Sequence, residues 1–137
     1  MKPKRRSVLS SRVRAFLRTP RVARLATIGA DGYPHVVPIW FLRDGKDLVM
    51  GSDDGEQKVV NARRNPRAAV QIGGDPESDQ AGYLIRGTIT VEPDPGRRKL
   101  RRLYAKYGEA LDERDDEWAN ENIVILRLKP TRVTRVW

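Results

Sequence analysis

Two Asp-Gly pairs, Asp31-Gly32 and Asp44-Gly45, each lie between apolar stretches and limit how this chain of 137 residues can fold. An Asp-Gly pair in that setting is typical of a tight β-hairpin turn, because such turns need residues that tolerate a positive φ. Strands joined by so short a connection must run antiparallel. The first half of the chain therefore predicts antiparallel strands in succession, not a doubly wound parallel sheet.

Hydrophobic periodicity over the whole chain predicts six strands and three helices. The second strand is apolar almost throughout, so we expect both of its faces to be buried. Short helices placed between antiparallel strands indicate a mainly β fold, a small closed or half-open barrel. The expected strands are 21–28, 35–42, 47–52, 67–72, 83–93 and 123–137, and the expected helices are 10–18, 55–65 and 95–108. We expect Ser10 or Ser11 to cap the first of these helices.

The basic residues are concentrated at the start of the chain. The formal net charge is +9, and residues 1–24 hold nine Lys and Arg and no acidic residue, so the remainder is balanced. We expect a basic tail at 1–9 followed by one domain at 10–137. Domains that bind nucleic acid usually spread basic and aromatic residues over a folded face. We therefore do not expect nucleic acid as a partner, and a binder that uses the N-terminal arm is kept as an alternative.

Several kinds of site are excluded or disfavoured by what the sequence lacks. The chain has no cysteine and a single histidine, His35, so we expect no metal site. It contains no glycine-rich phosphate loop of the G-x-x-x-x-G-K-[ST] or G-x-G-x-x-G type. No apolar run reaches the length of a membrane span. We expect a cytoplasmic protein without a membrane partner.

One stretch, Gly51 to Pro66, has the composition of an anion site. A strand ends at Gly51-Ser52 and a helix follows, and free backbone N–H groups at a helix start attract anions. We expect Asp53 or Asp54 to cap that helix. Lys58 lies in its first turn, where the helix dipole disfavours a cation unless an anion is close. Ser52, Lys58 and the amides of the helix are donors suited to a phosphate, and a solvated helix face is the alternative.

Four linked motifs give the chain a resemblance to a known family. They are L-A-T-x-x-x-D-G-x-P from Leu25, P-x-W-F from Pro38, Q-K-x-x-N-x-x-x-N-P from Gln57, and R-G-T at 86–88. Together they resemble the pyridoxamine 5'-phosphate oxidase-like split-barrel family. The resemblance covers residues 10–136 and is strongest to the short branch that uses the deazaflavin coenzyme F420.

The resemblance implies a six-stranded antiparallel split β-barrel of the FMN-binding type. It also implies a homodimer with two cofactor sites at the subunit interface, acting on a small-molecule substrate. The cofactor ring would lie along the second strand, and Ser52, Gln57 and Lys58 would hold the phosphate. The cofactor-binding residues implied in this way are His35, Val36, Val37, Pro38, Ile39, Trp40, Gly51, Ser52, Gln57, Lys58 and Asn61.

No catalytic residue follows from the sequence; Tyr83, Arg86 and Tyr104 are candidate proton donors by residue type alone. The chain has Glu56-Gln57-Lys58 where oxidases that use FMN commonly have Ser-Arg-Lys, and it ends at Trp137. We therefore expect a reductase that uses coenzyme F420, not a true pyridoxamine 5'-phosphate oxidase. An FMN-dependent oxidase or reductase, or a carrier without turnover, is the alternative. The N-terminal arginines would attract the anionic oligoglutamate tail of the deazaflavin.

Overall fold

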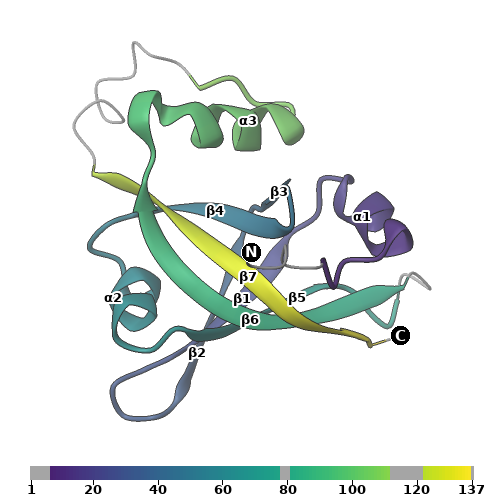
Figure 1. Cartoon of the computed structure of the whole chain (residues 1–137), viewed down its shortest axis with the longest axis horizontal. Helices are drawn as coiled ribbons and strands as arrows, with labels where there is room; N and C mark the ends of the chain where they lie inside the picture. The colour runs from purple at the N-terminus through teal and green to yellow at the C-terminus, as the bar shows by residue number, and fades with distance from the viewer. Residues whose placement is uncertain (1–6, 78–80, 112–121, 137) are drawn as a thin grey trace, which may run out of the picture.

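The computed structural model describes residues 7–77, 81–111 and 122–136 (Figure 1). Most of the expected basic tail, and of an acidic stretch at 109–121, therefore lies outside the described residues. The elements are α1 (Ser11–Leu17), β1 (Ala23–Ile28), β2 (Pro34–Ile39), β3 (Leu42–Asp44), β4 (Asp47–Asp53), α2 (Gln57–Arg64), β5 (Arg67–Gly73), β6 (Gly82–Pro93), a 3₁₀ turn η1 (Pro95–Arg97), α3 (Arg98–Lys106) and β7 (Ile123–Arg135).

All strands belong to one antiparallel sheet with the order β2-β1-β5-β6-β7-β4-β3. The strands at its two ends, β2 and β3, are neighbours in the chain and are joined only by Trp40 and Phe41. So short a link forces the sheet to curl until its ends approach each other, as the curved β6 and β7 of Figure 1 show. The prediction of a mainly β, antiparallel fold is confirmed.

The expected count of six strands is wrong by one, because the strand expected at 35–42 is interrupted. β2 ends at Ile39, and Phe41 turns inward with none of its surface exposed. The chain then resumes as β3, where Leu42 pairs with Val49 of β4. Burial of the Phe41 ring inside the barrel thus divides one expected strand into two.

Both expected hairpins form at the Asp-Gly pairs. In the first, Gly32 has a φ of 83° and the Asp31 carboxylate accepts the N–H of Tyr33 at 3.0 Å. In the second, Gly45 has a φ of 62° and Asp44 faces Asp47. The positive φ values explain why glycine occupies both positions.

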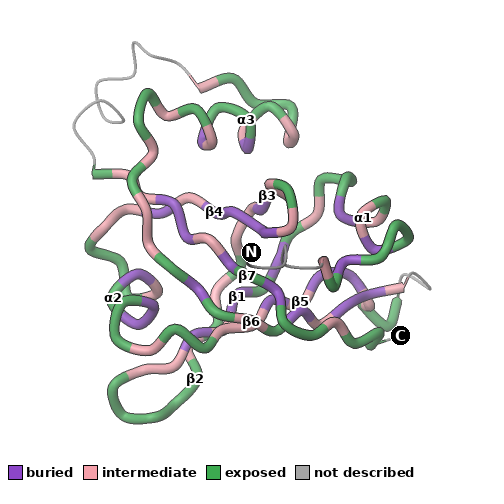
Figure 2. Tube along the Cα trace, in the orientation of Figure 1, coloured by how far each residue is buried: buried purple, intermediate pink, exposed green. Residues whose placement is uncertain are grey.

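β2 is not buried on both faces as its apolar sequence suggested. Alternate residues are exposed along it, and 58% of the surface of Val36 is accessible. Figure 2 shows this strand and its turn as an exposed hairpin at the edge of the molecule. The reason is its position at the end of the sheet, where β1 is its only partner among the described strands.

The helices close different parts of the barrel. α1 begins after Ser10, whose hydroxyl accepts the N–H of Val13 at 3.2 Å, and this confirms the expected N-cap. Its apolar side buries Val13 and Leu17, and Phe16 lies edge-on to Tyr83 with ring centroids 5.0 Å apart. α2 buries Val59 and Ala62 against the same core.

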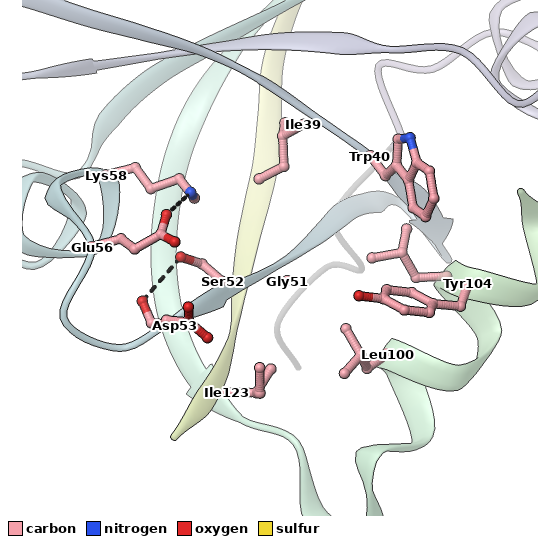
Figure 3. A pocket seen from close by; sticks show the side chains of 11 residues that line it. Ile39, Trp40, Gly51, Ser52, Asp53, Glu56, Lys58, Leu100, Tyr104 and Ile123 are labelled. Atoms are coloured by element: carbon pink, nitrogen blue, oxygen red, sulfur yellow. Dashed lines mark hydrogen bonds and ion pairs between the residues drawn. The ribbon is translucent and has the colours of Figure 1, made fainter. Parts of the chain in front are cut away.

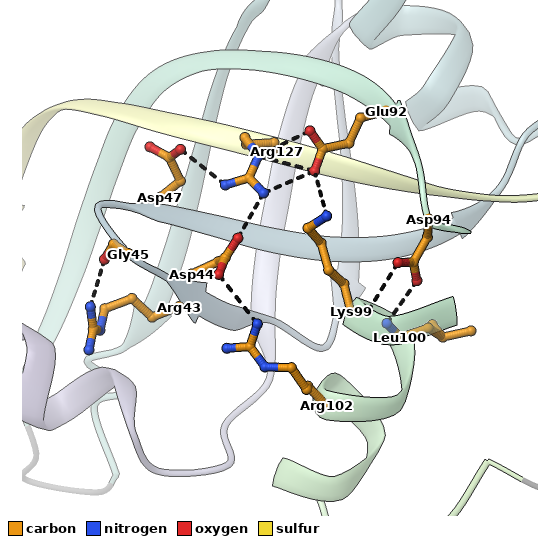
Figure 4. A network of polar contacts seen from close by, with 10 residues as sticks. All are labelled: Arg43, Asp44, Gly45, Asp47, Glu92, Asp94, Lys99, Leu100, Arg102 and Arg127. Atoms are coloured by element: carbon orange, nitrogen blue, oxygen red, sulfur yellow. Dashed lines mark hydrogen bonds and ion pairs between the residues drawn. The ribbon is translucent and has the colours of Figure 1, made fainter. Parts of the chain in front are cut away.

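A charged network around Arg127 fixes the beginning of α3 (Figure 4). Its guanidinium bonds Glu92, Asp44 and Asp47 within 3.2 Å, so the pKa of Arg127 is raised, chiefly by Glu92. The same guanidinium holds the pKa of Asp44 below its usual value. Two residues of α3 join this network, since Lys99 pairs with Glu92 at 3.6 Å and Arg102 pairs with Asp44 at 3.3 Å.

Candidate functional site

A pocket of about 200 Å³ lies between the end of β4, the start of α2 and the inner side of α3 (Figure 3). Its lining combines a polar end on β4 and α2 with an apolar and aromatic end on β2, α3 and β7. We call it the β4–α3 pocket. Its lining residues are Ile39, Trp40, Gly51, Ser52, Asp53, Glu56, Lys58, Leu100, Leu103, Tyr104 and Ile123.

The polar end contains a shielded cation. The Lys58 side chain is only 13% exposed, and its ammonium pairs with the carboxylate of Glu56, which is 46% exposed. Ser52 is buried beside them, and its hydroxyl donates to the carbonyl of Asp53 at 3.0 Å. Figure 3 shows the Lys58–Glu56 pair and the Ser52 hydroxyl on the same side of the pocket. This end therefore offers an ammonium and a hydroxyl to a ligand.

The expected cap of α2 is wrong. Neither Asp53 nor Asp54 caps the helix; the N-cap residue is Glu56, whose side chain makes no capping bond. A turn closed by the Glu56 N–H and the Asp53 carbonyl delays the helix, and Asp54 pairs instead with Arg63. The start of α2 thus has no side-chain cap, and its residues Glu56 and Lys58 line the pocket. Such a start suits an anionic ligand.

The other end of the pocket is aromatic and held in place. Trp40 stacks on Tyr107 with ring centroids 4.4 Å apart and meets Tyr104 edge-on at 5.7 Å. The Tyr107 hydroxyl donates to the carbonyl of Arg21 at 2.6 Å and accepts the N–H of Phe41 at 3.2 Å. Because both neighbours of the Tyr107 hydroxyl are backbone groups, the indole of Trp40 rests on a ring of fixed position.

A second hollow, of about 440 Å³, lies on the other side of α2 beside the first hairpin. It is lined by Gln57, Asn61 and His35 together with the turn at 29–34. Gln57 donates to the Asn61 side chain at 2.7 Å, and Asn61 donates to the buried Thr27 hydroxyl at 3.1 Å. Nδ1 of His35 is buried and has no hydrogen-bond partner among the described residues.

The eleven residues implied as cofactor ligands thus fall into three groups. Five line the β4–α3 pocket (Ile39, Trp40, Gly51, Ser52 and Lys58). Three line the hollow beside the first hairpin (His35, Gln57 and Asn61). Val36, Val37 and Pro38 lie between these groups on β2. Gln57 and Asn61 therefore face a different space from Lys58, although all three are on one helix.

Apart from Tyr104, named as a candidate proton donor by residue type alone, the sequence did not place α3 in the site. Leu100, Leu103 and Tyr104 form one wall of the β4–α3 pocket. Their helical spacing identifies one apolar side of this helix, and only the folded chain shows that the side faces a pocket. Of the three candidate proton donors, Tyr104 alone lines this pocket, and Figure 3 shows its hydroxyl directed into it. Tyr83 is buried in the core and Arg86 is exposed on β6.

Comparison with known proteins decides the family. The family model described as pyridoxamine 5'-phosphate oxidase matches residues 9–137. The chain belongs to this family. A solved structure named an F420 reductase has a similar fold, with a TM-score of 0.76 and 30% sequence identity to this chain. The alignment covers 88% of this chain and 94% of the other. A protein from Listeria innocua titled a putative pyridoxamine 5'-phosphate oxidase gives a TM-score of 0.73 at 24% identity, covering 91% and 95%.

Two curated relatives are reductases. One, a 5a,11a-dehydrotetracycline/5a,11a-dehydrooxytetracycline reductase from Streptomyces rimosus, is 37% identical over 92 residues, 61% of this chain and 64% of that protein. The other, an F420H(2)-dependent biliverdin reductase from Mycobacterium tuberculosis, is 35% identical over 89 residues, 63% of this chain and 61% of that protein. The matched regions span about three fifths of the length of these relatives.

The residues of the β4–α3 pocket fit the phosphate-bearing part of a cofactor such as F420 or FMN. A shielded ammonium, a hydroxyl and an uncapped helix start meet at one end, where a phosphate needs donors. A volume of about 200 Å³ holds only part of a flavin-sized molecule, and the rest would extend along the exposed edge of β2.

No group of three His, Asp or Glu side chains suited to a metal ion occurs in the ranges that the structure describes. No helix within those ranges is long and apolar enough to span a membrane.

Proposed function

We propose that the protein is an oxidoreductase that uses coenzyme F420 to reduce a small organic substrate. The observation that carries the proposal is the shielded Lys58 beside Ser52 and the uncapped start of α2, opposite an aromatic wall. The F420 reductase of similar structure and the F420H(2)-dependent relative support this choice of cofactor. For the substrate, the proposal names only its class, a small molecule.

In this proposal the chain binds and orients the cofactor and keeps water from it. Lys58 and Ser52 hold the phosphate, and the segment from His35 in β2 to Trp40 just after it lies along the ring. Coenzyme F420, when bound, supplies the hydride, as cofactors supply the reactive chemistry in such enzymes. Tyr104, whose hydroxyl is directed into the same pocket, would give a proton to the substrate.

We further propose that the protein acts as a homodimer in the cytoplasm. Apolar side chains remain exposed on β2 and its turn, with Tyr33 74% and Val36 58% accessible. An open apolar hollow of about 190 Å³, lined by Ala26, Ile28, Pro34, Ala68 and Ala69 among others, adjoins them. A second copy seated there would bury this face and cover the cofactor that extends from the β4–α3 pocket.

A fluorescence titration with F420 and with FMN tests the cofactor. We expect the protein to bind F420 tightly and FMN more weakly. Tighter binding of FMN would overturn the choice of cofactor in favour of an FMN enzyme of the same fold. Binding of F420 without reduction of any acceptor in a broad substrate screen would instead indicate a carrier.

Lys58→Ala tests the site. Loss of a charge-assisted bond to phosphate, about 1.5 to 3 kcal/mol, should weaken F420 binding at least about tenfold. Lys129→Ala, at an exposed position of β7, is the matched control and should leave binding unchanged. Equal affinity of the Lys58 variant and the wild type would contradict the phosphate assignment.

A further inference from the structure

The polar end of the β4–α3 pocket contains more negative than positive charge. Among its lining residues the charged side chains are Asp53, Glu56 and Lys58, two acids and one base. Glu56 pairs directly with Lys58, the one cation of the lining. A phosphate that bonds Lys58 therefore comes close to the Glu56 carboxylate, whether or not that carboxylate turns toward solvent.

Glu56 has no other evident task in the fold. It occupies the N-cap position of α2, yet its side chain makes no capping bond. Its carboxylate is partly exposed and its pair with Lys58 spans only two residues, so the fold does not depend on it. An ion pair in which one partner is about half exposed to solvent contributes little to stability. We therefore consider how the Glu56 carboxylate affects the ligand that the β4–α3 pocket binds.

The charge of a phosphate depends on its esterification. A phosphate monoester such as that of FMN carries close to two negative charges at pH 7, because its second pKa is about 6. A phosphodiester, the form in which F420 carries its phosphate, has one. Repulsion between a fixed carboxylate and the phosphate grows in proportion to the charge on the phosphate. Glu56 consequently opposes a monoester about twice as strongly as a diester.

We propose that Glu56 is a specificity-determining residue that makes the Lys58 cradle select a singly charged phosphodiester over a doubly charged phosphate monoester. This rests on the proposed function, in that it assumes a cofactor phosphate at Lys58. Lys58 supplies the attraction common to both phosphates, and Glu56 supplies the repulsion that separates them. Discrimination between ligands commonly needs such a repulsive element as well as an attractive one.

The test is a set of binding titrations, followed by fluorescence, with F420, FMN and riboflavin. Riboflavin has the ring of FMN and no phosphate. In Glu56→Gln we expect FMN to bind about tenfold tighter and F420 about threefold tighter than in the wild type, with riboflavin unchanged. Asp54→Asn is the matched control, since Asp54 pairs with Arg63 and does not line the pocket, and it should alter none of the three.

The possible results separate this inference from the proposed function. If Glu56→Gln changes the affinities for FMN and F420 by the same factor, Glu56 does not discriminate and the inference is wrong. If the wild type binds F420 no better than riboflavin, the assignment of the cofactor phosphate to Lys58 is wrong, and with it the proposed function on which this inference rests. Glu56→Ala, which removes the carboxylate and adds no capping group to α2, should reproduce the effect of Glu56→Gln, and the absence of any shift in a folded Glu56→Ala would also overturn the inference.

Discussion

Gly87, in the Arg86-Gly87-Thr88 motif, shows how a single residue is fixed by the fold. A Cβ at this position would lie 2.0 Å from the carbonyl oxygen of Lys129, and the pairing of β6 with β7 shifts register between Arg86 and Gly87. We expect Gly87→Ala to lower the free energy of unfolding by about 3 kcal/mol, because the backbone of β7 must move away. Urea denaturation followed by circular dichroism measures the change.

Thr88→Ala is the neighbouring control. Thr88 is exposed on β6, so its substitution should change stability by no more than about 0.5 kcal/mol. Equal stability of Gly87→Ala and the wild type would show that β7 is not so closely packed at this point.

Single residues differ in how far their sequence predicts their role. The cap of α1 was predicted at Ser10 or Ser11 and is Ser10; this could be predicted because the hydroxyl and the N–H that it binds are neighbours in the chain. The cap of α2 was predicted wrongly at Asp53 or Asp54, since Asp54 pairs with Arg63 instead and the helix starts later. The placement of Lys58 in a pocket was expected from the helix dipole, whereas its pair with Glu56 depends on side-chain positions that the pattern does not show.

At the scale of elements, the C-terminal end of α3 is held by a half-buried lysine. Nζ of Lys106 donates to the carbonyls of Leu17 and Phe41, each at 2.9 Å, and lies 3.6 Å from the centre of the Phe41 ring. Burial lowers the pKa of Lys106 from its ordinary 10.5 to about 8. Lys106 thus joins α3 to the end of α1 and to the link between β2 and β3.

The depressed pKa of Lys106 predicts a pH dependence of stability. Between pH 8 and pH 10.5 the unfolded chain keeps the proton of Lys106 while the folded chain releases it. The unfolded state then binds more protons, so this residue makes the free energy of unfolding rise with pH, by about 1 kcal/mol after allowance for its partial exposure. Below pH 8 both states are protonated and the contribution is constant.

Lys106→Met provides the comparison, measured by urea denaturation from pH 7 to pH 10. We expect the stability of the wild type relative to this variant to increase above pH 8. A difference that stays constant across the range would mean that burial does not depress the pKa of Lys106. Tyr107, whose pKa burial raises above its ordinary value of 10, is present in both proteins, so its titration cancels in the difference between wild type and variant.

Helices and strands were predicted correctly where the local sequence pattern and the tertiary packing agree. The Asp-Gly turns and the apolar runs gave the antiparallel strands, and the antiparallel pairing confirms them. The break between β2 and β3 was missed, because the inward turn of Phe41 depends on a barrel interior that no local pattern describes. The position of α3 was missed for a similar reason, since Arg127, Glu92 and Asp44 fix it from other strands.

At the scale of the whole molecule, the exposed edge of β2 is the feature on which the proposed homodimer rests. An apolar edge strand left open to solvent favours association with another chain. We expect light scattering to give about twice the chain mass of 15.6 kDa for the wild type. Val36→Lys should weaken association at least about tenfold, because two charged side chains would enter a symmetric apolar interface.

A matched substitution separates the interface from general surface effects. Val8→Lys changes a valine that is 41% exposed before α1, away from β2 in the chain, and should leave the dimer intact. If β2 carries the interface, Val36→Lys also weakens binding of F420, because the part of the cofactor that extends from the β4–α3 pocket loses its cover. A monomeric wild type, or a Val36→Lys variant that remains dimeric with full affinity, would contradict this arrangement and would require each chain to hold its cofactor alone.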